Sequence, residues 1–181
     1  MPYRFLLSLA LLAIAGCNNL SAQQQPPDPK MNQVIQTFQQ VEQTVKTSQG
    51  DQKKYLALVV EVSTAVTQIP NDTPPRVTEL LNASVVAYKL AWRYKQCDQK
   101  SLGKDQAICR DQHLEKVISK FPYIKRNITQ RLVQRTNPPK YISSVISTTN
   151  MLQLLLMQAE LNRVDAHLIL TGGSFDGVYP S

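Results

Sequence analysis

Apolar residues recur every three or four positions over most of this chain, which is the spacing of one face of an α-helix. The first stripe runs from Met31 to Val45, and Gly50 ends it. The second begins near Asp51 and ends at Pro70. Its many β-branched residues make it a poor isolated helix, so tertiary packing must stabilise it. The pattern predicts two successive amphipathic helices.

A third helix is predicted to start at Thr73, a suitable N-cap, with Pro74 in its first turn, where the missing N–H costs nothing. Further apolar residues lie beside its main apolar stripe, which indicates that this helix packs against neighbours on two sides. A shorter helix is expected from about Asp105 to Pro122, where proline breaks or kinks it, and a further helical segment follows.

The last helix is predicted to follow Asn137-Pro138-Pro139, with an apolar stripe from Ile142 to Ala159. Residues 151–157 are apolar nearly all round, which predicts a central helix, and Gly172-Gly173 ends it. No segment shows convincing strand alternation. Short connections between successive amphipathic helices predict an all-α, antiparallel bundle of about four to six helices.

The first seventeen residues follow another pattern. Arg4 carries a positive charge, an apolar run of about 11 residues extends from Phe5 to Ala15, and small residues precede Cys17. This run is too short to span a membrane, which needs roughly 20 residues, but the order is typical of an export signal. Ile14-Ala15-Gly16-Cys17 resembles the lipobox of bacterial lipoproteins. The alternative is an ordinary secretory signal with a coincidental cysteine.

The lipoprotein resemblance implies a domain organisation. Residues 1–16 would be the cleaved signal peptide, and Cys17 would receive a diacylglyceryl group on sulfur and an acyl chain on its amine. Two or more acyl chains anchor a protein stably to a membrane. Asn18, where an Asp would favour inner-membrane retention, implies the outer membrane, facing the periplasm. Residues 17–30 would form the lipidated cysteine and flexible tether, 31–171 the bundle, and 172–181 an irregular tail.

Two cysteines remain after lipidation of Cys17. Cys97 and Cys109 form an even pair in an oxidising compartment, which predicts a disulfide worth about 3 kcal/mol in the loop-entropy model. Metal binding is the rival, because Cys109 and His113 have helical ligand spacing. A structural zinc site needs four good ligands, however, and His167 is the one other histidine. We therefore expect no metal.

Positive charge is concentrated in the middle of the chain. The whole chain carries +7. Residues 89–140 hold thirteen Lys and Arg against four acids, a net +9, whereas the rest of the mature chain is −3. This segment is either an ordinary solvated face or a contact surface for an acidic protein, lipid headgroups or an anionic envelope polymer. The candidate contact residues are Lys116, Lys120, Lys125, Arg126, Arg131 and Arg135.

Catalytic signatures are missing from the sequence. Only His113 and His167 could serve a Ser/His/Asp arrangement, and no nucleophile-elbow, zinc-protease or phosphate-loop motif occurs. Aromatic residues accompany the basic segment, but an envelope address argues against nucleic acid, and the aromatics have the spacing of core residues. We therefore expect neither an enzyme nor a cofactor.

The sequence thus predicts a non-enzymatic, lipid-anchored, periplasm-facing adaptor or assembly-assisting protein that binds an envelope protein or an anionic envelope component. Its predicted architecture is similar to that of the pilotins of secretion systems, which bind a partner helix in an apolar groove. The alternatives are an enzyme acting on envelope polymers and a small-ligand carrier with a cavity between helices. Within the binding hypothesis, an apolar groove beside residues 152–157 competes with the basic surface.

Overall fold

Helices make up nearly all of the structure that a computed structural model describes, namely residues 28–47, 52–100, 103–137 and 139–173. No strand occurs in these ranges, which confirms the predicted all-α bundle. The helices are α1 (Pro29–Thr47), α2 (Gln52–Val66), α3 (Pro75–Gln96), α4 (Lys104–Lys120), α5 (Pro122–Val133) and α6 (Thr148–Thr171), with short 3₁₀ turns η1 (Cys97–Gln99) and η2 (Ile142–Val145).

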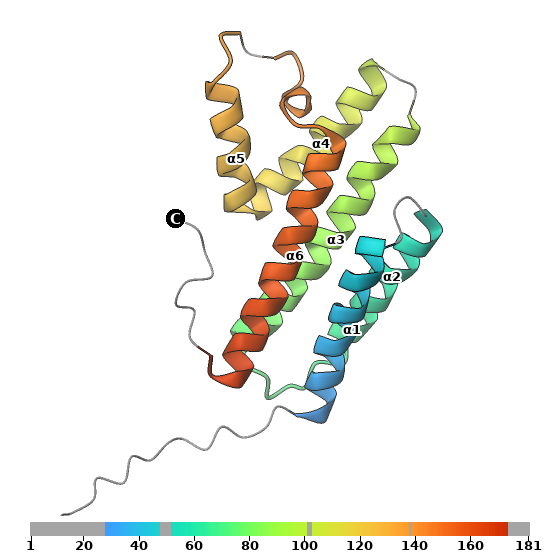
Figure 1. The fold of residues 1–181 in the computed structure, drawn as a ribbon, viewed down its shortest axis with the longest axis vertical. Coiled ribbons are helices and arrows are strands. Elements are labelled where there is room, and N and C mark those ends of the chain that lie inside the picture. The colour runs from blue at the N-terminus through green and yellow to red at the C-terminus, as the bar shows by residue number, and fades with distance from the viewer. Residues whose placement is uncertain (1–27, 48–51, 101–102, 138, 174–181) are drawn as a thin grey trace, which may run out of the picture.

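The two longest helices, α3 and α6, run side by side in opposite directions along the middle of the molecule (Figure 1). Helix α1 packs on α2 and α6, and α2 packs on α3. Helices α4 and α5 and the turn η2 cover the end of the bundle at which α3 finishes. The start of α1, the start of α3 and the end of α6 lie at the opposite end (Figure 1).

Small residues allow α3 and α6 to approach closely. Ser84, Ala87 and Ala91 lie on one face of α3 and are fully buried, as is Ala159 on α6. The Ser84 hydroxyl donates a hydrogen bond to the Ala159 carbonyl oxygen, 2.9 Å away across the interface. Large side chains fill the space around this contact, including Phe38, Tyr88, Leu81, Met151 and Leu155.

A buried ion pair joins α1 to α6. The Nε atom of Arg163 donates to a carboxylate oxygen of Glu42 at 2.7 Å, and each residue is only 8% exposed. The polar neighbours of Glu42 in the sequence favoured surface exposure for it, which the structure shows to be wrong. The pair links α1 to α6 at this point, and each charge is tolerated away from water because it is paired.

Several predicted helix boundaries are confirmed. Helix α4 ends before Pro122, which opens α5, and α6 ends at Gly172 with a φ of 64°, a left-handed conformation that glycine adopts without strain. One start was wrong: Thr73 is not the N-cap of α3, since Pro74 occupies that position without a side-chain cap and Pro75 begins the helix.

The predicted start of the last helix was also wrong. Residues 142–145 form the turn η2, and α6 begins at Thr148, where the Ser147 hydroxyl accepts a hydrogen bond from the Asn150 amide. The Asp111 carboxylate on α4 accepts hydrogen bonds from the amides of Ile142 and Ser143. These amides belong to the first turn of η2, where no partner within the turn is available, so Asp111 caps η2 from α4.

Helix α6 is less enclosed than its composition predicted. Leu155 is fully buried, but Leu152, Leu154 and Leu156 are half-buried, and Met157 is exposed. The reason is that α6 packs mainly against α3 and along one side against α1. Among the described helices, none combines the length and the hydropathy that crossing a membrane requires.

Candidate functional site

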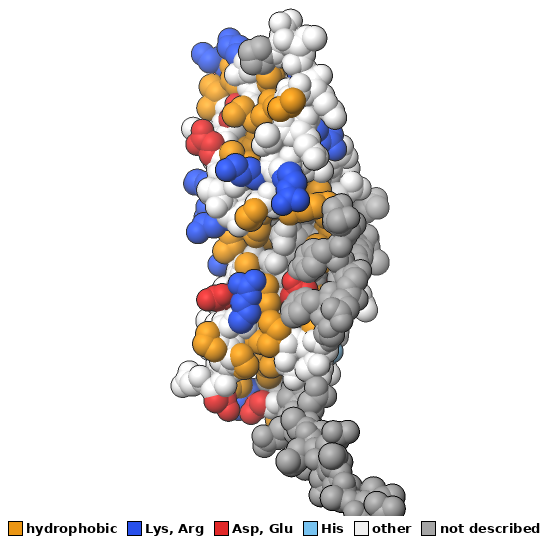
Figure 2. Space-filling model, turned by 90° about the vertical axis from the view of Figure 1, so that its left-hand side faces the viewer, with side chains coloured by type: hydrophobic (Ala, Val, Ile, Leu, Met, Phe, Trp, Pro, Cys, Tyr) orange, Lys and Arg blue, Asp and Glu red, His pale blue; other side chains and the backbone are white. Residues whose placement is uncertain are grey.

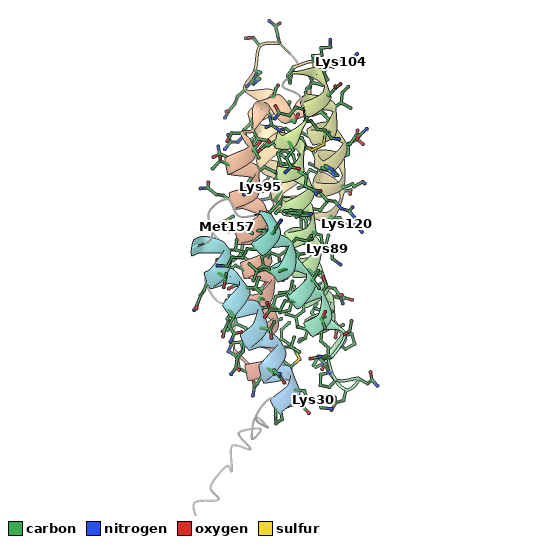
Figure 3. The ribbon with its side chains drawn as sticks, turned by 90° about the vertical axis from the view of Figure 1, so that its right-hand side faces the viewer. Lys30, Lys89, Lys95, Lys104, Lys120 and Met157 are labelled. Carbon is green, nitrogen blue, oxygen red and sulfur yellow. A yellow bond between two sulfur atoms is a disulfide. The ribbon has the colours of Figure 1, made fainter. Side chains whose placement is uncertain are left out.

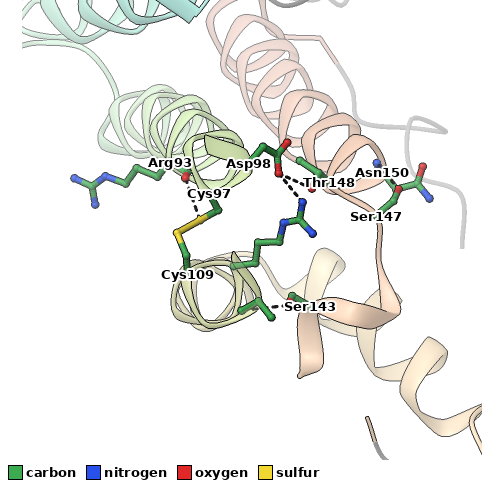
Figure 4. Close-up of polar contacts among 10 residues, drawn as sticks. Arg93, Cys97, Asp98, Cys109, Ser143, Ser147, Thr148 and Asn150 are labelled. Carbon is green, nitrogen blue, oxygen red and sulfur yellow. Dashed lines mark hydrogen bonds and ion pairs between the residues drawn. A yellow bond between two sulfur atoms is a disulfide. The ribbon is translucent and has the colours of Figure 1, made fainter. Parts of the chain in front are cut away.

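The predicted disulfide is present. Cys97 lies directly after α3 and Cys109 lies on α4, with their Cα atoms 5.7 Å apart (Figure 4). The bond fastens the first half of α4 to the end of α3. It therefore fixes where the cations of α4 lie relative to those of α3. Cys17, the predicted lipidation site, is outside the described residues.

Two of the four acids in the basic segment bind groups of the protein itself. Asp98 accepts hydrogen bonds from the Arg110 guanidinium at 2.5 Å and from the Thr148 hydroxyl at 3.2 Å (Figure 4). Asp111 binds the two amides of η2. These carboxylates are therefore not placed to neutralise the exposed cations of α3 and α4.

His113 lies against the disulfide, so that its ring and both sulfur atoms fall within 4.8 Å of one another. In the disulfide form the sulfurs are not thiolates, and thiolate is the form of cysteine that binds metals. Burial, followed by the charges of Lys116 and Arg93, lowers the pKa of the His113 imidazole. Its ring therefore experiences the positive potential of α3 and α4.

The six predicted contact residues are all exposed, and two of them line a described cavity. Lys116 and Lys120 on α4 line a cavity of about 250 Å³ between α3 and α4, hereafter the basic cavity. The residues lining it do not include Lys125, Arg126 and Arg131 of α5, or Arg135 beyond it. Figure 2 views the molecule from the side on which α5 lies in Figure 1. On this face the Lys and Arg side chains lie scattered among apolar and uncharged side chains.

Two cations that the sequence did not single out complete the basic cavity. Lys89 and Arg93 extend from α3, one helical turn apart, opposite Lys116 and Lys120, which are one turn apart on α4. Figure 3 shows Lys89 and Lys120 next to each other at mid-height of the bundle. The other lining residues are Val86, Leu90 and Ser119, so none of the described lining residues is acidic.

A larger hollow adjoins the basic cavity. This α2–α3 groove has a volume of about 520 Å³ and shares Lys89 and Arg93 with the basic cavity as part of its lining. Trp92 lies in its wall and stacks on Tyr55, with ring centroids 5.9 Å apart. Its remaining lining residues are Leu56, Val59, Val60, Ser63, Thr64, Thr67 and Gln96.

A third hollow lies where the competing apolar site was expected, between α1, α3 and α6. Its volume is about 250 Å³, and it is lined by Leu156 and Met157 together with Glu42, Val45, Tyr88, Gln153 and Glu160. The Tyr88 hydroxyl is buried and has no hydrogen-bond partner among the described atoms. Burial, followed by the charge of Glu42, raises the pKa of this phenol far above its usual range.

Comparison with known proteins identifies no relative: no family model, curated protein or solved structure matches the chain. Function must therefore be inferred from the residues and their geometry. The signal that could have found Lys89 and Arg93 is their one-turn spacing, at the same interval as Lys116 and Lys120. Nothing in the sequence indicated that these two pairs face each other.

Proposed function

We propose that this is a non-enzymatic, lipid-anchored protein of the bacterial envelope that binds an anionic envelope component through the basic cavity. The observation that carries the proposal is the convergence of Lys89, Arg93, Lys116 and Lys120 on a hollow whose described lining contains no acid. Four like charges this close repel one another, so an anion that enters relieves the repulsion as well as gaining its own attraction.

The position of the cavity supports a partner away from the anchoring membrane. Eleven residues separate Cys17 from Pro29, where α1 begins at one end of the bundle. Lys89 and Arg93 lie in the second half of α3, and Lys89 and Lys120 lie at mid-height of the bundle, away from Lys30 near the start of α1 (Figure 3). At about 1.5 Å per residue, Lys89 is roughly 20 Å along α3 from its start. A bundle tethered at its α1 end presents the cavity to the periplasm.

The arrangement of the histidines favours binding over catalysis. His113 lies beside the disulfide on α4, whereas His167 lies near the end of α6, at the opposite end of the bundle. The two imidazoles, the side chains most often used in general acid–base chemistry, therefore lie too far apart to serve one site together.

One observation favours a second candidate function, a small-ligand carrier. A buried phenol without a partner, as at Tyr88, would gain a hydrogen bond from a molecule seated in the cavity between α1, α3 and α6. Native mass spectrometry of protein taken from the envelope tests this candidate. If the protein is a carrier, its mass spectrum should contain a co-purified small molecule, and Tyr88→Phe should lose that molecule. A spectrum that shows the mass of the protein alone would argue against a carrier.

Charge reversal tests the preferred function. We expect Lys116→Glu/Lys120→Glu to abolish association of the full-length lipoprotein with its envelope partner in detergent-solubilised membranes. The matched control is Lys125→Glu/Arg126→Glu, which makes the same charge change at exposed positions outside the cavity. Both doubles should keep the helical circular dichroism spectrum, because exposed charges contribute little to stability.

Salt provides the second arm of this test. Association of the parent should weaken as salt rises, because charges are screened over about 8 Å at physiological ionic strength. At low salt the two double variants should differ clearly in how strongly they associate with the partner. If both double variants lose association equally, association depends only on overall charge. If neither loses association, the basic cavity is refuted as the contact surface.

A further inference from the structure

We infer that the occupant of this surface is an acidic amphipathic helix of a partner protein. Its apolar side chains would lie in the α2–α3 groove, and its carboxylates would face the basic cavity. This inference rests on the proposed function and names its partner. The two hollows form one continuous surface, because Lys89 and Arg93 line both of them.

The groove carries apolar side chains that the fold leaves uncovered. Leu56 and Val60 on α2 are 45% and 57% exposed and lie one helical turn apart beside the groove. They are among the few described large apolar residues with such exposure. Adjacent exposed apolar residues rimmed by charge are typical of a protein contact site.

The spacing of the lining residues fits a helix. Leu56 and Val60 on α2, Lys89 and Arg93 on α3, and Lys116 and Lys120 on α4 form three pairs with i, i+4 spacing. Such residues rise about 6 Å along a helix, the interval at which a bound helix repeats side chains on its own face. The α2 part of the lining, Leu56 to Thr64, is roughly 12 Å long, which corresponds to about two turns of a partner helix.

The polar part of the lining favours a peptide over a lipid. Ser63, Thr64, Thr67 and Gln96 line the groove beside its apolar residues. The hydroxyls of Ser63, Thr64 and Thr67 each donate to a backbone carbonyl oxygen of α2, which leaves their lone pairs able to accept a hydrogen bond. An acyl chain would cover these acceptors without donating to them, whereas polar side chains of a peptide can donate. A polyanionic polysaccharide would satisfy the cations but would leave Leu56 and Val60 without apolar contacts.

Crosslinking in living cells tests the inference on the full-length lipoprotein. A photoactivatable phenylalanine analogue replaces Val60 in one strain and Lys120 in another, and mass spectrometry identifies what each captures. We expect both positions to capture the same segment of one protein, with apolar residues at helical spacing and an excess of Asp and Glu. A lipid or glycan adduct, two unrelated segments, a segment without excess acids, or no adduct from position 60 would overturn the inference.

Affinity measurements with a synthetic peptide of the captured segment separate the two proposals. Leu56→Asp/Val60→Asp should weaken binding at least about tenfold at every salt concentration, as expected when apolar anchors are lost. Val133→Asp is the matched control, because Val133 is 79% exposed on α5, outside both hollows. It should bind like the parent, and all variants should keep the helical spectrum because the replaced side chains are exposed.

The outcomes of the two substitution sets are distinguishable. If Lys116→Glu/Lys120→Glu abolishes binding and Leu56→Asp/Val60→Asp does not weaken it, the partner is anionic but makes no apolar contact. The inference then fails and the proposed function stands. If neither double variant weakens binding, both fail.

Discussion

Removing one member of the buried pair Glu42–Arg163 should destabilise the fold more than removing both. Arg163→Met leaves the Glu42 carboxylate without its 2.7 Å partner, and Glu42→Leu leaves the guanidinium stranded. The double change replaces both charges by apolar groups of similar volume. Breaking a buried pair from one side typically costs about 3–5 kcal/mol, whereas apolar replacement of both is close to neutral.

The structure places Arg163→Met at the lower end of that range. Glu42 is 8% exposed and lines the cavity beside Tyr88, so water can reach its carboxylate there. We expect a loss of about 3 kcal/mol, or a fall in Tm of roughly 6–12 °C for a domain of this size. Glu42→Leu should cost at least as much, because a guanidinium cannot relieve its burial by losing a proton.

Urea denaturation of the chain from Lys30 to Ser181, followed by circular dichroism, measures these losses. We expect this chain to fold alone in one transition, because the buried core lies within it. A loss below about 1 kcal/mol from either single change, or a double loss equal to the sum, would refute this account of the pair.

Three further predictions concern the chain's cysteines and a buried phenol. Cys97→Ser/Cys109→Ser should lower stability by about 3 kcal/mol, and free thiols in protein taken from the envelope would contradict the bond. Cys17→Ser should leave the precursor uncleaved and without fatty-acid label; surviving label would refute lipidation there. Burial raises the pKa of Tyr94 to about 12, so stability should fall as pH rises from about 10, where the unfolded phenol ionises. Tyr94→Phe should flatten that fall, and equal slopes in urea titrations would count against a buried phenol.

The sequence by itself determined the helices and most of their limits. Apolar spacing of three and four positions depends on residues within one turn of each other, so it can be read locally, as can a stop at Pro122 or Gly172. The disulfide followed from an even count of cysteines once an export signal was predicted. Lipidation of Cys17 and the binding function remain predictions.

Only the tertiary structure decided which faces meet. Glu42 and Arg163 are 121 positions apart, and their pairing depends on how α1 crosses α6, which no local pattern encodes. The capping of η2 likewise depends on Asp111, a carboxylate from another helix. The basic cavity also depends on the tertiary packing of helices. One-turn spacing fixed each pair of cations on its own helix, but the packing of α4 against α3, held by the disulfide, brought the two pairs together.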